Sequence, residues 1–86
     1  MPWMVMIHRS ARKVLRRLDQ TTRHRITEKI RALGDNPDDP ALDVRPLFSG
    51  IAYRLRVGGW RIIFLRKEDV RVISIERIRS RGKAYK

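Results

Sequence analysis

The segment from residue 52 to residue 65, AYRLRVGGWRIIFL, constrains the fold more tightly than any other part of the chain. Apolar and charged residues alternate on both sides of Gly58-Gly59, which predicts a β-hairpin, because glycine accepts the positive φ that two-residue hairpin loops require. Residues that pair across such a hairpin share a face of the sheet. The predicted pairs are Val57–Trp60, Arg56–Arg61, Leu55–Ile62, Arg54–Ile63 and Tyr53–Phe64. One face should therefore be apolar, while Arg54, Arg56 and Arg61 converge on the other.

This group of arginines is either an anion-binding site or an ordinary solvated face. Like charges directly opposite each other destabilise a sheet, so the Arg56–Arg61 pair favours a function that uses the charge. The solvated face stays open as the simpler alternative, because exposed ion pairs on it would contribute only about 0–1 kcal/mol.

The next strand extends both faces if the loop before it has an even number of residues. We then expect Phe64 to pair with Ile73, Ile62 with Ile75 and Arg61 with Glu76. This register would bring a carboxylate onto the arginine face.

The rest of the chain predicts two helices and further strands. An apolar stripe at helical spacing follows Ser10, a residue type that caps helices: Ala11, Val14, Leu15 and Leu18. A second helix should run from a cap at Thr21 or Thr22 to a stop at Gly34. Strands are expected at residues 3–7, 44–47, 51–57, 60–66 and 70–77. The expected fold is α+β, one domain of residues 1–86 with an N-terminal strand and an αα-hairpin packed on a small, mainly antiparallel, twisted sheet.

The chain is strongly basic. Its 21 Lys and Arg against 9 Asp and Glu give a net charge of +12 at pH 7, which implies a polyanionic or acidic partner. Arginine predominates, and its planar guanidinium binds phosphate in bidentate fashion, which favours nucleic acid over a membrane surface. The absence of cysteine excludes disulfides and thiolate zinc sites and is typical of the cytoplasm.

Neither a metal nor another cofactor is expected. His8 and His24 lie apart in the predicted fold, and no carboxylate stands at ligand spacing from them. The serines lack the context of a catalytic triad or a nucleophile elbow. The apolar opening MPWMVMI is too short for a signal peptide or a membrane span.

The arginine face should also carry an apolar strip, formed by Ala52, Ile63, Leu65 and Val72. A monomer rarely leaves such a strip exposed. We therefore expect a partner segment to cover it, with Ile63, Leu65 and Val72 as binding residues.

The chain closes with IERIRSRGKAYK, in which basic residues surround Tyr85. Such a tail is either a disordered, phosphate-attracting segment or an RNA-binding element in which the tyrosine stacks on an unpaired base or transfers a proton.

Two motifs resemble a known family. The block YRLRVGGWRIIF is similar to the Y-R-x-R-x-G-x-Y-R-hydrophobic-hydrophobic-Y block of RelE/ParE superfamily toxins, which come from bacterial and archaeal toxin–antitoxin operons. The closing RGKAYK resembles the R-G-x-x-Y-K ending of the family. Trp60 and Phe64 stand where tyrosines are more usual. The resemblance covers essentially the whole chain and implies the RelE-like microbial RNase fold.

The resemblance implies a ribosome-dependent mRNA endonuclease, or interferase, that inhibits translation in the cytoplasm by cleaving the codon in the ribosomal A site. The 2′-hydroxyl of the RNA attacks the adjacent phosphate without a metal or other cofactor, leaving a 2′,3′-cyclic phosphate and a 5′-hydroxyl. An acidic, RelB-like antitoxin is the implied protein partner, in a toxin–antitoxin hetero-oligomer. Two alternatives stay open: a poison of DNA gyrase, as in the ParE branch, and a nucleic-acid-binding module without catalysis.

The resemblance also implies roles for single residues. Arg61 corresponds to the arginine that stabilises the reacting phosphate, and Arg54 and Arg56 to basic residues at the scissile region. Arg81 matches the arginine that aids the leaving 5′-oxygen, and Tyr85 the tyrosine that stacks on the nucleotide.

Further basic residues are expected to bind RNA, namely Arg79, Lys83 and Lys86. Because arginine is a poor general base at neutral pH, the base is open among Glu76, Lys83 and Tyr85. Glu76 ranks first if it pairs with Arg61.

Overall fold

The computed structural model describes residues 2–47 and 50–80, which form two helices and five strands. Their limits lie close to those predicted. In chain order the elements are β1 (Met4–Ile7), α1 (Arg9–Arg17), α2 (Gln20–Asp35), β2 (Val44–Pro46), β3 (Ala52–Val57), β4 (Trp60–Lys67) and β5 (Val72–Ser80).

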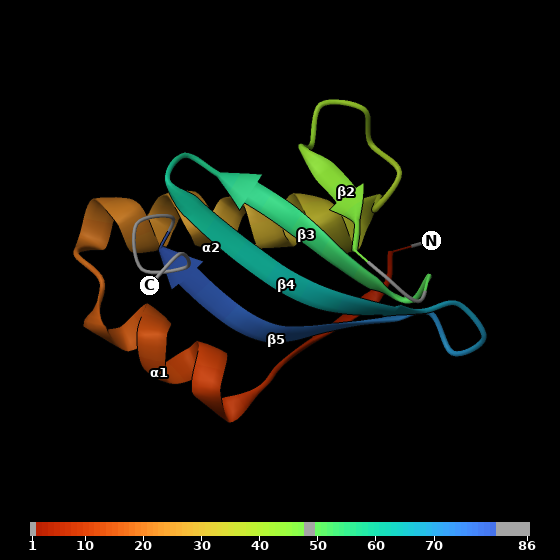
Figure 1. The fold of residues 1–86 in the computed structure, drawn as a ribbon, viewed down its shortest axis with the longest axis horizontal. Helices are drawn as coiled ribbons and strands as arrows, with labels where there is room; N and C mark the ends of the chain where they lie inside the picture. Colours follow the sequence, from red (N-terminus) through yellow and green to blue (C-terminus); the bar gives the residue numbers. More distant parts are fainter. Residues whose placement is uncertain (1, 48–49, 81–86) are drawn as a thin grey trace.

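The five strands form one sheet in the order β1-β5-β4-β3-β2 (Figure 1). Strand β1 is parallel to β5, and all other neighbours are antiparallel. Both helices pack on the same side of the sheet, so the other side, which we call the open face, is not covered by a helix. This arrangement confirms the predicted α+β fold with its mainly antiparallel sheet.

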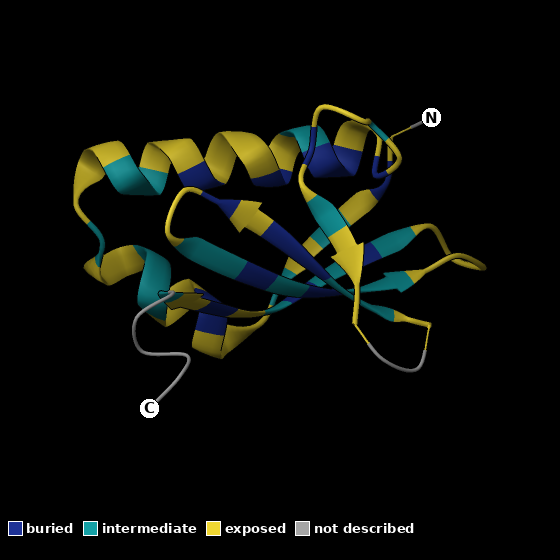
Figure 2. Ribbon diagram, turned by 45° about the horizontal axis from the view of Figure 1, so that its top comes forward, coloured by how far each residue is buried: buried dark blue, intermediate teal, exposed yellow. Residues whose placement is uncertain are grey.

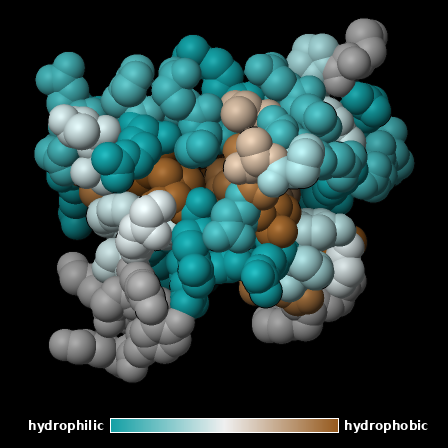
Figure 3. Space-filling view, turned by 90° about the horizontal axis from the view of Figure 1, so that it is seen from above, coloured by the Kyte–Doolittle hydropathy of each residue, from teal (hydrophilic) through white to brown (hydrophobic). Residues whose placement is uncertain are grey.

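The core lies between the helices and the sheet (Figure 2). The apolar stripe of the hairpin points into it, as predicted, and Phe64 is 1% exposed. The sheet contributes Leu55, Val57, Ile62, Phe64, Ile73, Ile75 and Ile78, and the helices contribute Ala11, Ile26, Ile30 and Leu33. Viewed from above, hydrophilic side chains dominate the surface, and hydrophobic atoms are visible mainly in the hollows between them (Figure 3).

Within residues 2–47 and 50–80, no helix combines the length and the apolar composition needed to cross a bilayer.

The helix caps differ from those predicted. His8, not Ser10, caps α1, and its Nδ1 accepts a hydrogen bond from the backbone N–H of Ser10 at 3.2 Å. Asp19, not Thr21 or Thr22, caps α2 and accepts from the N–H of Thr22 at 3.0 Å. Hydrogen bonding to the side chain of Thr22, and then to its backbone N–H, lowers the pKa of Asp19. At the start of α2, Asp19, Thr21 and Thr22 are all residue types that cap helices, so the pattern could not single out the one that is used. At the start of α1 the cap is His8, which is not among the preferred types.

Gly34 does not stop α2, contrary to the prediction. It lies in the last turn of the helix and contacts β1. A Cβ at this position would lie 2.6 Å from Cγ2 of Val5, and the N–H of Trp3 donates to the carbonyl of Gly34 at 2.7 Å. A glycine therefore permits the close contact between the helix and the first strand.

The β3–β4 hairpin has the predicted two-residue loop, and all five predicted pairs are present. Of the two loop glycines, only Gly58 has a positive φ, at 59°, as in a type II′ turn. The hairpin therefore confirms the deduction that its arginines share one face.

The predicted register of β5 is wrong. The loop from residue 68 to residue 71 does have an even number of residues, but Phe64 pairs with Ile75 instead of Ile73. A β-bulge then leaves Glu76 without a partner on β4, and Arg61 pairs with Arg79 instead of Glu76. The bulge adds a third arginine where a carboxylate was expected.

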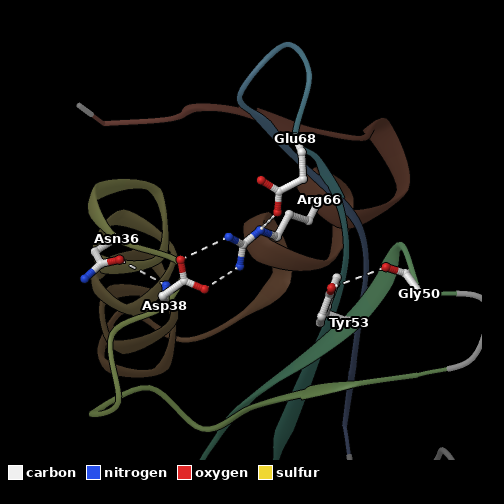
Figure 4. A network of polar contacts seen from close by, with 6 residues as sticks. All are labelled: Asn36, Asp38, Gly50, Tyr53, Arg66 and Glu68. Atoms are coloured by element: carbon white, nitrogen blue, oxygen red, sulfur yellow. Dashed lines mark hydrogen bonds and ion pairs between the residues drawn. The ribbon is translucent and has the colours of Figure 1, made fainter.

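A cation–π cluster links Trp3, which directly precedes β1, to β4 and to the loop before β5. Trp3 is 9% exposed, and the guanidinium groups of Arg66 and Arg71 each lie 5.0 Å from the centroid of its ring. Arg66 donates two hydrogen bonds to Asp38, at 2.8 and 3.0 Å, and also contacts Glu68 (Figure 4). These contacts join β1, β4 and the segment after α2.

The Asp38–Arg66 pair makes a testable prediction about acid stability. The hydrogen bonds from Arg66 hold the pKa of Asp38 below its ordinary value of 3.8. The pair therefore stabilises the fold above pH 3.8, and this contribution is lost as the pH falls through the lower, folded-state pKa. We expect Asp38→Asn to lower the melting temperature at pH 7, and the gap from the unmodified chain to close on acidification. A gap of the same size at pH 7 and pH 2.5 would contradict this role.

Candidate functional site

Three arginines lie side by side on the open face, one from each of three neighbouring strands. Arg56 of β3 pairs with Arg61 of β4, which pairs with Arg79 of β5. We call Arg56, Arg61 and Arg79 the arginine row. Arg61 is partly buried, while the other two are exposed. Paired like charges destabilise a sheet, so an anion bound across the row would relieve a cost that is built into the fold.

A second cationic row lies beside the first. Arg45 of β2, Arg54 of β3, Ile63 of β4 and Arg77 of β5 are consecutive neighbours across the sheet. The open face therefore carries six arginines on four strands at the end of the sheet where the β3–β4 hairpin turns.

Arg54 differs from the other arginines because it is buried, with 8% of its surface exposed. Its Nη2 lies 3.7 Å from Oδ1 of Asp43. Burial, followed by the charge of Arg56, lowers the pKa of Arg54, while Asp43 opposes the shift. The guanidinium stays protonated, because arginine is not deprotonated in proteins. Arg54 is therefore a buried, fixed charge within the second row.

Glu76, the bulge residue of β5, does not stand opposite Arg61. Its Oε2 accepts a hydrogen bond from Oγ of Ser74 at 2.6 Å, and its backbone carbonyl accepts from Oγ of Ser10 at 3.1 Å. The register that ranked Glu76 first as general base is therefore incorrect, although its carboxylate lies on the open face together with Ser74.

The apolar strip also lies on the open face and is larger than predicted. Ala52, Ile63, Leu65 and Val72 are all partly exposed. Met6 of β1 is the neighbour of Ser74, and Met4 is the neighbour of Val72, so both methionines extend the strip to the edge of the sheet. They are 56% and 65% exposed, respectively. We call Met4, Met6, Ala52, Ile63, Leu65 and Val72 the apolar strip.

Several residues of the predicted site lie outside the described residues, namely Arg81, Lys83, Tyr85 and Lys86. The two histidines that we set aside are exposed and far apart in the chain, with His8 capping α1 and His24 on α2. Residues 2–47 and 50–80 contain no group of three or more His, Asp or Glu side chains that could hold a metal ion.

Sequence reasoning named Arg79 as an RNA-binding residue but did not place it opposite Arg61, and it did not include Arg45 or Arg77 in the site. The sequence did carry one signal for the position of Arg79, namely the spacing of the isoleucines in β5. Ile73, Ile75 and Ile78 are the buried residues of this strand. The spacing changes from two to three at Glu76, which is the pattern of a bulged strand. Arg45 gave no comparable signal, because three residues of β2 are too few to fix a register.

The chemistry available to the arginine row is anion stabilisation. Adjacent guanidinium groups can donate several hydrogen bonds to one phosphate and stabilise charge that develops on it. None of these groups can accept a proton at neutral pH. A reaction at this site must therefore draw its nucleophile from the substrate or its base from another residue.

Comparison with protein families gives one match. The family described as the ParE toxin of the type II toxin–antitoxin system parDE matches residues 5–85. No curated protein sequence matches this chain.

Solved structures show the same fold. The chain is similar to archaeal RelE in its complex with RelB from Pyrococcus horikoshii OT3, with 30% identity, a TM-score of 0.84, and coverage of 96% of this chain and 99% of that one. It also resembles the RelB–RelE complex from Methanococcus jannaschii, with 24% identity, a TM-score of 0.76 and coverage of 93% and 94%. The chain is also similar to the intact RelBE complex of E. coli, with 20% identity, a TM-score of 0.73, and coverage of 91% of this chain and 95% of that one. The last two show similarity of fold alone.

Proposed function

Because the chain belongs to the RelE/ParE superfamily of toxins from type II toxin–antitoxin systems, we propose that it inhibits translation by cleaving mRNA in the ribosomal A site. The observation that carries the proposal is the arginine row, in which Arg56, Arg61 and Arg79 lie together on the open face. This charge suits a reaction that creates negative charge on a phosphate.

In the proposed reaction, the 2′-oxygen of the RNA forms a bond to the adjacent phosphorus while the bond from phosphorus to the 5′-oxygen breaks. A general base takes the proton of the 2′-hydroxyl, and the leaving 5′-oxygen gains one. Arg61 stabilises the charge on the phosphorane, and Arg54 and Arg56 hold the scissile region. The products are a 2′,3′-cyclic phosphate and a 5′-hydroxyl.

The remaining roles follow the family resemblance. We assign donation to the leaving oxygen to Arg81, stacking on the nucleotide to Tyr85, and further RNA contacts to Lys83 and Lys86. Glu76, Lys83 and Tyr85 remain the candidates for the base. The substitutions Glu76→Gln, Lys83→Met and Tyr85→Phe remove these candidates one at a time. The base is the residue whose replacement abolishes the rise of the cleavage rate with pH.

The proposal is tested with purified components. Labelled mRNA should be cut when it is bound to programmed ribosomes and left intact when naked, with a 5′-hydroxyl on the downstream product. Chelator at a concentration that keeps the ribosomes intact should not change the rate. Equal cleavage of naked RNA would refute the dependence on ribosomes.

The family match itself favours a second candidate, because it is to ParE toxins. In that case the target is DNA gyrase, and the arginine row would bind an anionic surface without cleaving RNA. Accumulation of trapped DNA–gyrase complexes with intact mRNA would select this alternative.

We further propose that an acidic, RelB-like antitoxin covers the apolar strip and neutralises the arginines. Support comes from Met4 and Met6, which are exposed on the same face as Leu65, and from the net charge of +12. The solved relatives named above are complexes of RelE with RelB.

The antitoxin proposal predicts the effect of Leu65→Asp. A carboxylate in the centre of the apolar strip should weaken binding of the cognate antitoxin about 30-fold or more, as at other interface hot spots. Val70→Asp is the matched control, because Val70 is 59% exposed in the loop after β4, outside the strip. Titration of the antitoxin against both variants measures the difference. Equal affinities would remove Leu65 from the interface.

A further inference from the structure

A pocket of about 430 Å³ lies between the last turn of α1 and the ends of β4 and β5. Its residues are Val14, Arg17, Leu18, Trp60, Ile78, Arg79 and Ser80. Of these, only Arg79 belongs to the arginine row. This volume lies within the range of about 300–1,000 Å³ that is usual for small-ligand sites.

The register of the sheet explains how the pocket forms. Trp60 follows the hairpin loop and pairs with Ser80, while its neighbour Ile62 pairs with Ile78. These side chains share the helical side of the sheet. Strand β1 pairs only with residues 72–75 of β5, so the rest of β5 extends beyond β1 and packs against α1. The pocket is the space left where α1 ends.

The lining combines three chemical features. Val14, Leu18 and Ile78 provide apolar walls, and Trp60 adds an aromatic ring. Two cationic residues, Arg17 and Arg79, also line the pocket, and none of the lining residues carries a carboxylate. A flat, apolar-faced group that is tethered to an anion matches all three features, because unpaired bases stack on aromatic rings and guanidinium planes. An aliphatic side chain of a protein partner would use the walls but not the charges.

The pocket and the arginine row lie on opposite sides of the sheet and adjoin at Arg79 of β5. Arg79 lines the pocket and also pairs with Arg61, and Trp60 directly precedes Arg61. An RNA strand with one phosphate on the row can therefore turn a neighbouring base around the edge of β5. We infer that the pocket at Trp60 binds an unstacked nucleobase of the RNA strand whose phosphate lies on the arginine row. This inference rests on the proposed function, and it makes Trp60 and Arg17 determinants of nucleotide preference.

The fluorescence of Trp60 can report binding at the pocket, because the chain has only two tryptophans. In the Trp3→Phe variant Trp60 is the sole indole, and in Trp60→Phe only Trp3 remains. The probe is a short single-stranded RNA with methylated 2′-hydroxyls, which this mechanism cannot cleave. The matched probe has the same backbone without bases. If Trp3→Phe does not fold, the indole N–H signal of Trp60 in the NMR spectrum of the unmodified chain replaces fluorescence.

We expect the RNA to change the fluorescence of Trp60 and the abasic backbone to leave this fluorescence unchanged. Val14→Phe, which fills the pocket, should weaken RNA binding about 5- to 150-fold, corresponding to the stacking of one base. It should also alter which nucleotides flank the cleavage sites on programmed ribosomes. The Trp3 signal in Trp60→Phe should not respond.

Several results would overturn the inference: no Trp60 response to RNA, an equal response to the abasic backbone, or unchanged nucleotide preference in Val14→Phe. A Trp60 response to the antitoxin but not to RNA would assign the pocket to that protein. Because the probe needs neither ribosomes nor cleavage, the two proposals fail separately. If the fluorescence of Trp60 responds to RNA but the chain never cuts mRNA, only the proposed function is contradicted.

Discussion

Arg61→Ala should reduce the single-turnover rate of mRNA cleavage on programmed ribosomes by about 10²–10³-fold, the loss typical of one transition-state donor. Arg61 is the central member of the arginine row, between Arg56 and Arg79, so its removal leaves the phosphate without the middle guanidinium. The fold should persist, because the substitution also removes two pairs of like charges.

Lys67→Ala is the matched control for Arg61→Ala. It removes one positive charge from the far end of the same strand, where Lys67 is exposed and pairs with Val72. The control should cleave at nearly the rate of the unmodified chain. Equal losses in both variants would mean that only net charge matters, and an unfolded Arg61→Ala, detected by circular dichroism, would give Arg61 a structural role instead.

Phe64→Ala should lower the free energy of unfolding by about 3–5 kcal/mol, the usual cost of removing a large buried aromatic side chain. Phe64 is 1% exposed, stacks on Tyr53 at a centroid distance of 5.6 Å and pairs with Ile75 on β5. The loss is a large part of the 5–15 kcal/mol that is typical of folded domains. Urea titrations of both chains measure it.

The control for Phe64→Ala is Val70→Ala in the exposed loop. Val70 is 59% exposed, so its truncation should change the free energy of unfolding by less than about 0.5 kcal/mol. A loss below about 1 kcal/mol for Phe64→Ala would place the centre of the core elsewhere.

The hairpin and the helices could be predicted because local physics determines them. A two-residue loop permits one pairing of Val57 with Trp60, and the apolar stripes of α1 and α2 follow helical spacing. From these elements the arginine face and the layer order follow, and both were predicted correctly.

The rest depends on contacts that are distant in the sequence. The register of β5 depends on a bulge at Glu76, which local alternation alone does not position. The burial of Arg54 and the approach of α1 to the end of β5, which forms the pocket at Trp60, result from the packing of whole elements. The cap at Asp19 competed with Thr21 and Thr22, which suit the role almost equally well.

The extra arginine that the bulge supplies strengthens the proposed function. In the predicted register, Glu76 would have stood opposite Arg61 and formed an ion pair with it, which competes with a phosphate for the guanidinium. With Arg79 in that position, the row holds only positive charge. The register of β5 thus moves Glu76 away from Arg61, and the bulge brings Arg79 into the row.

Primer extension on mRNA from cells that briefly express the chain tests the central claim most directly. The account predicts cuts within translated codons, none upstream of the start codon, and no cuts with Arg61→Ala expressed at the same level. Intact mRNA in cells whose growth has stopped, together with trapped DNA–gyrase complexes, would contradict it.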